Sequence, residues 1–155
     1  MFLYEFFVWL SDTALGQYLN QSTAAFASTE SLHIVALSLV VGAALITHLF
    51  ALGIALKTVD APEVARNLQP VILGGLIVVA ISGALLVAAG PFKYYTNPLF
   101  PLKLGLLAAA LLAQWQLGRR LRRDGVVSKS TRALALASLL LWTAVVITGR
   151  WLGLI

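Results

Sequence analysis

The sequence predicts an all-α membrane protein: a polytopic four-helix bundle preceded by an N-terminal amphipathic helix at the membrane interface. Of its 155 residues, 60% are hydrophobic and only 11% are charged, and the mean hydropathy is +0.91. Soluble domains carry about 25% charged residues, so this composition excludes a soluble enzyme, a secreted disulfide scaffold and a disordered chain. Four apolar stretches can each cross a hydrocarbon core about 30 Å thick, at about residues 31–56, 70–90, 99–117 and 131–152.

Residues 1–29 are predicted to form the interfacial segment, and residues 30–155 the four-helix transmembrane domain. The segment begins with several aromatic residues, and polar residues then alternate with leucines such as Leu15 and Leu19. No Lys or Arg precedes Glu30, so the segment lacks the basic start of a signal peptide. Aromatic side chains favour the level of the lipid headgroups, and we therefore expect this segment to lie on the membrane.

Capping residues and prolines predict where the spans begin and end. Ser28 and Thr29 are suitable N-caps for the first span, and Pro70 suits the first turn of the second. Residues 57–69 are predicted to be a linker, and residues 92–98 an aromatic interfacial loop. Gly118 is predicted to stop the third span.

The basic residues are distributed unequally between the two sides of the membrane domain. Only Lys93, Lys103 and Arg150 belong to one side, although the chain has 11 Lys and Arg residues. By the positive-inside rule, the loops on the more basic side face the cytoplasm. We therefore predict a multi-pass protein of the bacterial inner membrane with both termini in the periplasm. The cytoplasmic cations are Lys57, Arg66, Arg119, Arg120, Arg122, Arg123, Lys129 and Arg132.

The same loops explain the net charge of +5 and the pI near 10.0, so the charge predicts no nucleic-acid partner. The chain has no Cys and one Met. Disulfides and thiolate metal sites are therefore excluded, and a copper(I) carrier, which needs soft sulfur ligands, is disfavoured.

Five ionisable residues in or beside the spans are the candidate site residues: Glu30, His33, His48, Lys103 and Arg150. Ionisable groups inside a membrane are costly and therefore indicate a function. The topology brings all of them except His48 to one level near the periplasmic face. These four residues are called here the outer layer. A structural alternative would also explain it: the long side chains would extend to the membrane interface, and Glu30 would form an ion pair with Lys103 or Arg150. The convergence of four such groups at one depth favours a site.

The chemistry of this layer suits a b-type haem or a quinone. His33 would bind the haem iron, and Lys103 and Arg150 would hold the anionic propionates. A quinone headgroup would use the imidazole for hydrogen bonding and the Glu30 carboxylate for handling protons. Zinc is disfavoured, because it needs three or four ligands and the two cations would oppose it.

His48 is a weaker candidate for a second haem iron ligand. It lies 15 residues beyond His33, which is about 22 Å along a helix and on the same broad face. The chain has only these two histidines, so bis-His ligation would need a partner subunit or a second copy of the chain. A hydrogen-bonded structural histidine is the alternative, with Gln114 or Gln116 at a similar depth as partner.

Three groups of motifs resemble a family of small bacterial integral membrane proteins of unknown function. The resemblance covers nearly the whole chain and implies an amphipathic N-terminal segment followed by four helices, but no reaction. The sequence departs from it at Thr47-His48-Leu49-Phe50, where the family commonly has Asp followed by Leu-Arg. A weaker similarity links the Leu-His and Val-Gly pattern to copper-resistance membrane domains. The motifs are Glu30-Ser31-Leu32-His33 with Val41-Gly42, Phe100-Pro101-Leu102-Lys103-Leu104, and Gly149-Arg150-Trp151.

These observations predict a membrane subunit of a redox complex, which binds b-type haem or quinone near the periplasmic face and relays electrons. Its expected partners are the lipid bilayer and other membrane or periplasmic redox subunits, or a second copy of itself. The alternative is a cofactor-free accessory or scaffold subunit that packs through its Gly and Ala faces. A free-standing enzyme is disfavoured, because the sequence shows no nucleophile–base pair and no carboxylate pair within a span.

Overall fold

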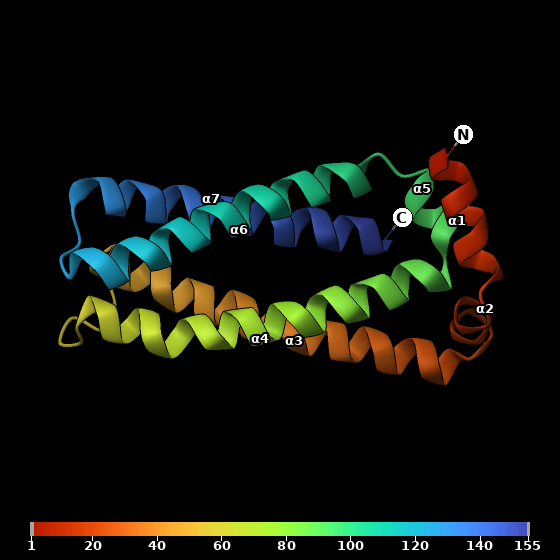
Figure 1. Ribbon diagram of the computed structural model, residues 1–155, viewed down its shortest axis with the longest axis horizontal. Coiled ribbons are helices and arrows are strands. Elements are labelled where there is room, and N and C mark those ends of the chain that lie inside the picture. Colours follow the sequence, from red (N-terminus) through yellow and green to blue (C-terminus); the bar gives the residue numbers. More distant parts are fainter. Residues whose placement is uncertain (1, 155) are drawn as a thin grey trace.

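The computed structural model describes residues 2–154 and is a bundle of four long antiparallel helices with shorter helices across one end (Figure 1). The four long helices are each long and apolar enough to cross a membrane, so this is a multi-pass membrane protein. The prediction of an all-α four-helix membrane bundle is confirmed. The helices are α1 (Phe2–Asp12), α2 (Ala14–Gln21), α3 (Thr23–Ala51), α4 (Ala61–Ala89), α5 (Pro91–Tyr95), α6 (Leu99–Asp124) and α7 (Lys129–Leu154).

The long helices form two hairpins, because packing is most extensive between α3 and α4 and between α6 and α7. The hairpins meet through fewer contacts, which join α4 to α6 and α3 to α7. One cluster of buried apolar residues surrounds Phe50 and Leu121, near the loops at residues 52–60 and 125–128. A second cluster surrounds Val40 and Trp142 in the middle of the bundle.

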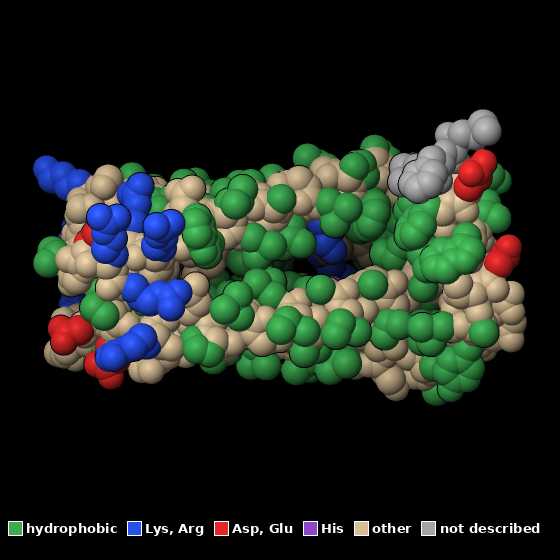
Figure 2. All heavy atoms as spheres, in the orientation of Figure 1, with side chains coloured by type: hydrophobic (Ala, Val, Ile, Leu, Met, Phe, Trp, Pro, Cys, Tyr) green, Lys and Arg blue, Asp and Glu red, His purple; other side chains and the backbone are tan. Residues whose placement is uncertain are grey.

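The end that carries these two loops is called here the basic end. Figure 2 shows Lys and Arg side chains gathered there, whereas hydrophobic side chains cover most of the face between the two ends. The separation of charge predicted from the sequence is therefore present in the structure. The eight residues of the basic end are Lys57, Arg66, Arg119, Arg120, Arg122, Arg123, Lys129 and Arg132.

The opposite end, called here the aromatic end, is covered by α1, α2 and α5 (Figure 1). Rings from α1 and α5 pack together, with centroids 5.8 Å apart for Tyr4 and Tyr95 and 5.4 Å apart for Phe7 and Tyr95. On α2, the amide nitrogen of Asn20 donates to the Ala89 carbonyl oxygen at 2.6 Å and so ties α2 to the end of α4. The N-terminal aromatic segment thus lies across the bundle end instead of crossing the membrane with the long helices.

The first long helix begins earlier than the sequence predicts. Its N-cap is Ser22, whose hydroxyl accepts a hydrogen bond from the Ala25 amide at 3.2 Å. Ser28 and Thr29, predicted as caps, lie inside α3 and donate to carbonyl oxygens four residues earlier. The prediction of their capping role is wrong because their hydroxyls are equally well satisfied within a continuing helix.

The second and third spans also belong to longer helices. Pro70 lies inside α4, which begins at Ala61, so most of the predicted linker is helical. The third span does not stop at Gly118, because α6 continues through the Leu- and Arg-rich segment to Gly125. Gly125 has a φ of 62°, a left-handed conformation that glycine adopts without steric cost. Hydropathy detects apolar stretches and not helix ends: these helices extend beyond the predicted spans, except that α3 ends at Ala51 although the first span was predicted to reach about residue 56.

The contact between Gly75 and Val40 gives the first testable prediction, because α3 and α4 approach closely there. A Cβ at position 75 would lie 2.5 Å from Cγ2 of Val40, which is fully buried. We expect Gly75→Ala to lower the free energy of unfolding by about 1–3 kcal/mol through overpacking. Unfolding in mixed micelles followed by circular dichroism would measure the loss.

The neighbouring Gly74 supplies a matched control, since a Cβ there would have no atom within 4 Å. Gly74→Ala should leave stability unchanged or raise it slightly, because alanine has the higher helix propensity. Adding Val40→Ala to Gly75→Ala should recover part of the lost stability. Equal losses at positions 74 and 75 would contradict the described packing of α3 on α4.

Candidate functional site

His33 is held on α3 by a hydrogen bond to the neighbouring helix. Its Nδ1 lies 2.9 Å from the Ser82 hydroxyl oxygen on α4, and that hydroxyl lies 2.6 Å from the Val78 carbonyl oxygen. A carbonyl can only accept, so the one proton of Ser82 goes to Val78 and the hydroxyl accepts from Nδ1–H of His33. This network assigns the proton of the neutral imidazole to Nδ1 and leaves Nε2 unprotonated, with the Val79 backbone of α4 also within hydrogen-bonding reach of the ring.

A glycine on α4 makes room for the imidazole. A Cβ atom at Gly83 would lie 3.2 Å from Cε1 of His33, closer than most real contacts of this kind. The ring therefore rests directly against the α4 backbone, with Ser82 bonded to one of its nitrogens. Ser82 and Gly83 were not among the predicted site residues. Both belong to a stretch of α4 that is rich in small residues, and small residues in a membrane helix ordinarily indicate only close packing.

The two predicted cations come from the other hairpin. Lys103 of α6 crosses to α7, where its Nζ lies 3.4 Å from the position of a Cβ at Gly149. Arg150 is the next residue of α7 and is exposed. In Figure 2, Lys or Arg side chains are visible inside a hollow between α4 and α6 in the half toward the aromatic end. Lys103 is close enough to His33 for its charge to act on the imidazole.

Glu30 completes this polar layer from one turn earlier on α3. It is exposed, and its charge acts on His33 and on Tyr94 of α5. Burial raises the pKa of the Tyr94 hydroxyl, and the negative charge of Glu30 raises it further. The structure therefore brings Glu30 and Lys103 each within electrostatic range of His33, and it adds Tyr94 beside Glu30, which the sequence prediction did not include.

The shift at Tyr94 gives a direct test of this arrangement. Because the Glu30 carboxylate disfavours the negatively charged tyrosinate, Glu30→Gln should lower the pKa of Tyr94 toward its ordinary value of about 10. Burial still acts on the neutralised site, so the pKa should remain above that value. Ultraviolet absorbance of tyrosinate as a function of pH would measure it, with Tyr94→Phe identifying the contribution of this residue. An unchanged titration would show that Glu30 and Tyr94 are not close.

His48 lies apart from this layer, in the core of the other half of the bundle. It is fully buried, and its Nε2 is 2.9 Å from the Ser138 hydroxyl oxygen on α7. Gln114 of α6 lies beside the ring, whereas Gln116 is exposed. These contacts favour the alternative of a hydrogen-bonded core histidine, because a haem iron at Nε2 would have to displace Ser138.

Within residues 2–154, no group of three or more His, Asp or Glu side chains could bind a metal ion. A metal held at His33 would therefore need further ligands from elsewhere than a cluster of such side chains in this part of the chain. The unprotonated Nε2 of His33 is the best candidate ligand atom in this layer. The ring that carries it is oriented by the hydrogen bond from Nδ1 to Ser82 and by that from Ser82 to Val78.

Comparison with known proteins identifies a family but no characterised relative. No curated protein and no solved structure matches the chain. One family model matches residues 6–155, and that family is described only as a family of unknown function, DUF6644. The match includes the three groups of motifs on which the resemblance was based. The chain therefore belongs to the DUF6644 family.

Proposed function

We propose that this protein is an integral membrane subunit of a redox complex, which binds a b-type haem near its aromatic end through His33 and relays electrons. The observation that carries this proposal is the unprotonated Nε2 of His33, held in place by Ser82. Histidine ligands of metals commonly donate their other nitrogen to a hydrogen-bond acceptor, which fixes the ring orientation and raises its basicity.

The residues around His33 fit such a cofactor. Lys103 supplies a cation within electrostatic range of the imidazole, and Arg150 lies at the same level on α7. Either cation could hold a propionate, and a bound haem would supply one-electron redox chemistry. A second axial ligand would come from a partner subunit or from a second copy of this chain.

A quinone is the alternative ligand for the same residues. The Lys103 ammonium would donate to a carbonyl oxygen, and Nε2 of His33 would accept a hydrogen bond from a quinol hydroxyl. Glu30, which is exposed near the same end, would exchange protons with water.

The distribution of Lys and Arg between the two ends supports an orientation of the protein in the membrane. The basic end would face the cytoplasm of a bacterium, which would place the aromatic end and both chain termini in the periplasm. The layer around His33 would then lie near the periplasmic surface, where a periplasmic or membrane redox partner would exchange electrons with it.

A cofactor-free accessory subunit is the second candidate, and a separate observation favours it. Gly42, Gly74 and Gly105 lie on the long helices, and a Cβ atom at any of them would have no atom within 4 Å. Small residues on open helix faces allow another membrane helix to approach closely. These positions therefore suit assembly with neighbouring subunits.

The absorption spectrum of the purified protein distinguishes these functions. The protein should be purified with its natural partners and measured oxidised and then reduced with dithionite, followed by a pyridine haemochrome assay. A Soret band and a reduced α-band are expected for a haem subunit. A colourless preparation that retains its partners in fixed ratio, and from which no quinone is extracted, would instead support the accessory subunit.

A further inference from the structure

A cavity of about 250 Å³ lies between α4 and α6, in the half of the bundle toward the basic end. Its walls are mainly apolar, with Ile72 on α4 and Leu111 on α6 among them. Leu73 and Trp115 also line the cavity, and each is more than half exposed on the surface that faces lipid. The cavity therefore opens toward the bilayer, where the two hairpins meet.

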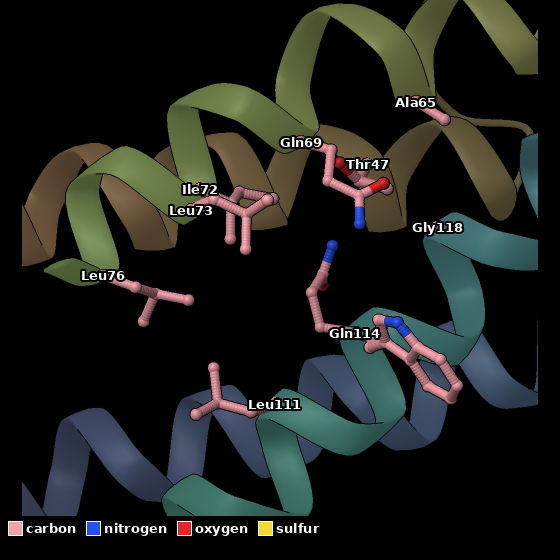
Figure 3. A pocket seen from close by; sticks show the side chains of 10 residues that line it. Thr47, Ala65, Gln69, Ile72, Leu73, Leu76, Leu111, Gln114 and Gly118 are labelled. Carbon is pink, nitrogen blue, oxygen red and sulfur yellow. The ribbon is translucent and has the colours of Figure 1, made fainter.

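Two carboxamides reach into this apolar space from opposite helices, Gln69 from α4 and Gln114 from α6 (Figure 3). The orientation of Gln69 is determined by Arg122, which donates a hydrogen bond to its Oε1. Because a guanidinium can only donate, the amide N–H2 group of Gln69 is the end left for the cavity. Gly118 accommodates this side chain, since a Cβ there would lie 3.0 Å from Oε1 of Gln69.

The wall behind Gln114 holds buried polar atoms that lack partners. Gln114 is only 7% exposed, and among residues 2–154 its Oε1 has no hydrogen-bond partner. His48 is fully buried beside it, and although its Nδ1 makes no complete hydrogen bond within residues 2–154, the Gln114 side chain lies within hydrogen-bonding reach of the imidazole. Nearly all buried polar atoms in proteins are hydrogen-bonded, and exceptions commonly mark a place for a ligand or water.

We propose that this cavity is a binding pocket for the headgroup of a quinone, one carbonyl oxygen of which accepts hydrogen bonds from the amide groups of Gln69 and Gln114. Figure 3 shows the nitrogen ends of the two amides directed toward each other across the space. Arg122 fixes the orientation of Gln69, so its N–H2 group is a donor directed into the cavity, and a carbonyl oxygen with two lone pairs can accept from it and from Gln114. The proposal is independent of the function proposed for His33.

The depth of the pocket favours a quinone over the ester carbonyl of a glycerolipid. Arg119, whose guanidinium lies 5.4 Å from the ring centre of Trp115, belongs to the cluster of cations at the basic end. Gln69 lies at the level of these cations, because Arg122 donates to it, whereas Gln114 is five residues farther from that end than Arg119, which is about 8 Å deeper along the helix. Glycerolipid esters stay near the interfacial cations, whereas a quinone has no charged headgroup to hold it there. The mainly apolar walls suit its ring.

Quinone binding can be measured with the full chain in lipid nanodiscs, using decylubiquinone as the probe and quenching of tryptophan fluorescence as the signal. Wild-type protein should bind one quinone saturably. Gln69→Leu/Gln114→Leu, which removes both donors at similar volume, should weaken binding about tenfold or more. Gln116→Leu is the matched control on α6 and should change nothing, because Gln116 is exposed.

Several results would overturn the proposal. One is the absence of saturable quinone binding to folded wild-type protein. Another is a double variant that binds quinone as tightly as wild type does. A third is a Gln116→Leu variant that loses as much quinone affinity as the double variant. Loss of binding in His33→Ala would place the quinone at the aromatic end instead. Native mass spectrometry that finds a phospholipid retained only when Gln69 and Gln114 are present would assign the pocket to a glycerolipid. If the double variant does not fold, Gly118→Ala displaces the Gln69 amide without removing a polar group and should weaken quinone binding.

Discussion

Replacing His33 by alanine should abolish binding of the haem or quinone at the aromatic end and leave the four-helix bundle intact. The imidazole is the proposed ligand of the haem iron, so its removal takes away the protein's bond to that iron. The same substitution also removes the acceptor for a quinol hydroxyl. Loss of the Soret band in the purified variant, with an unchanged circular dichroism spectrum, is the expected result for haem.

Two further variants separate a ligand role of His33 from a packing role. Ser82→Ala keeps the imidazole but removes the group that fixes its tautomer, and should weaken cofactor affinity about 10–100-fold. His48→Ala should leave the spectrum of the aromatic-end cofactor unchanged, because His48 lies in the other half of the bundle. If His33→Ala retained a wild-type spectrum and His48→Ala lost it, the cofactor would belong to His48 instead.

The four spans were predictable from the sequence because a long apolar stretch has no other favourable environment than lipid or a buried core. The ends of the helices were not. Polar or charged side chains make up half of residues 23–30 and all but one of residues 119–124, yet these residues continue α3 and α6 beyond the apolar stretch. A continuing helix satisfies its backbone within itself, so it costs little to extend one into water. Capping residues inside such an extension, such as Ser28, then form bonds within the helix.

The candidate site was predictable only where its residues carry charge. His33 and Lys103 stand out in the sequence because an ionisable group within a span is costly, and the topology brings them to one level. Ser82 and Gln69 give no such signal. A serine in an apolar helix satisfies its hydroxyl on the preceding turn, as Ser82 does with Val78, so its presence there needs no partner from another helix.

The glycines that contact these residues could not be predicted from the sequence either. Gly83 lies against His33, Gly149 against Lys103, and Gly118 against Gln69. Each contact joins different helices, and the pairing depends on how the helices pack. In the sequence the same glycines form part of a general excess of small residues, which any closely packed membrane bundle shows.

Truncation of Trp142 should produce the largest loss of stability of any single substitution in the middle of the bundle. Trp142 on α7 is 2% exposed and packs with apolar residues of the other three long helices, among them Val40 and Ala110. Trp142→Ala should lower the free energy of unfolding by about 3–5 kcal/mol, because the cavity that remains loses these contacts on every side. Unfolding in mixed micelles, followed by far-ultraviolet circular dichroism, measures the difference from wild type.

Trp151 on the same helix is the matched control, since it is 59% exposed. Trp151→Ala leaves no internal cavity and should cost much less than Trp142→Ala. Trp142→Phe should also cost less than the alanine variant, because the ring fills most of the space and the substitution removes an indole N–H that has no hydrogen-bond partner within residues 2–154. Equal losses at positions 142 and 151 would mean that α7 presents a different face to the bundle. In that case Ser138, one turn before Trp142, could not reach His48, and the polar groups of α7 would need a new assignment.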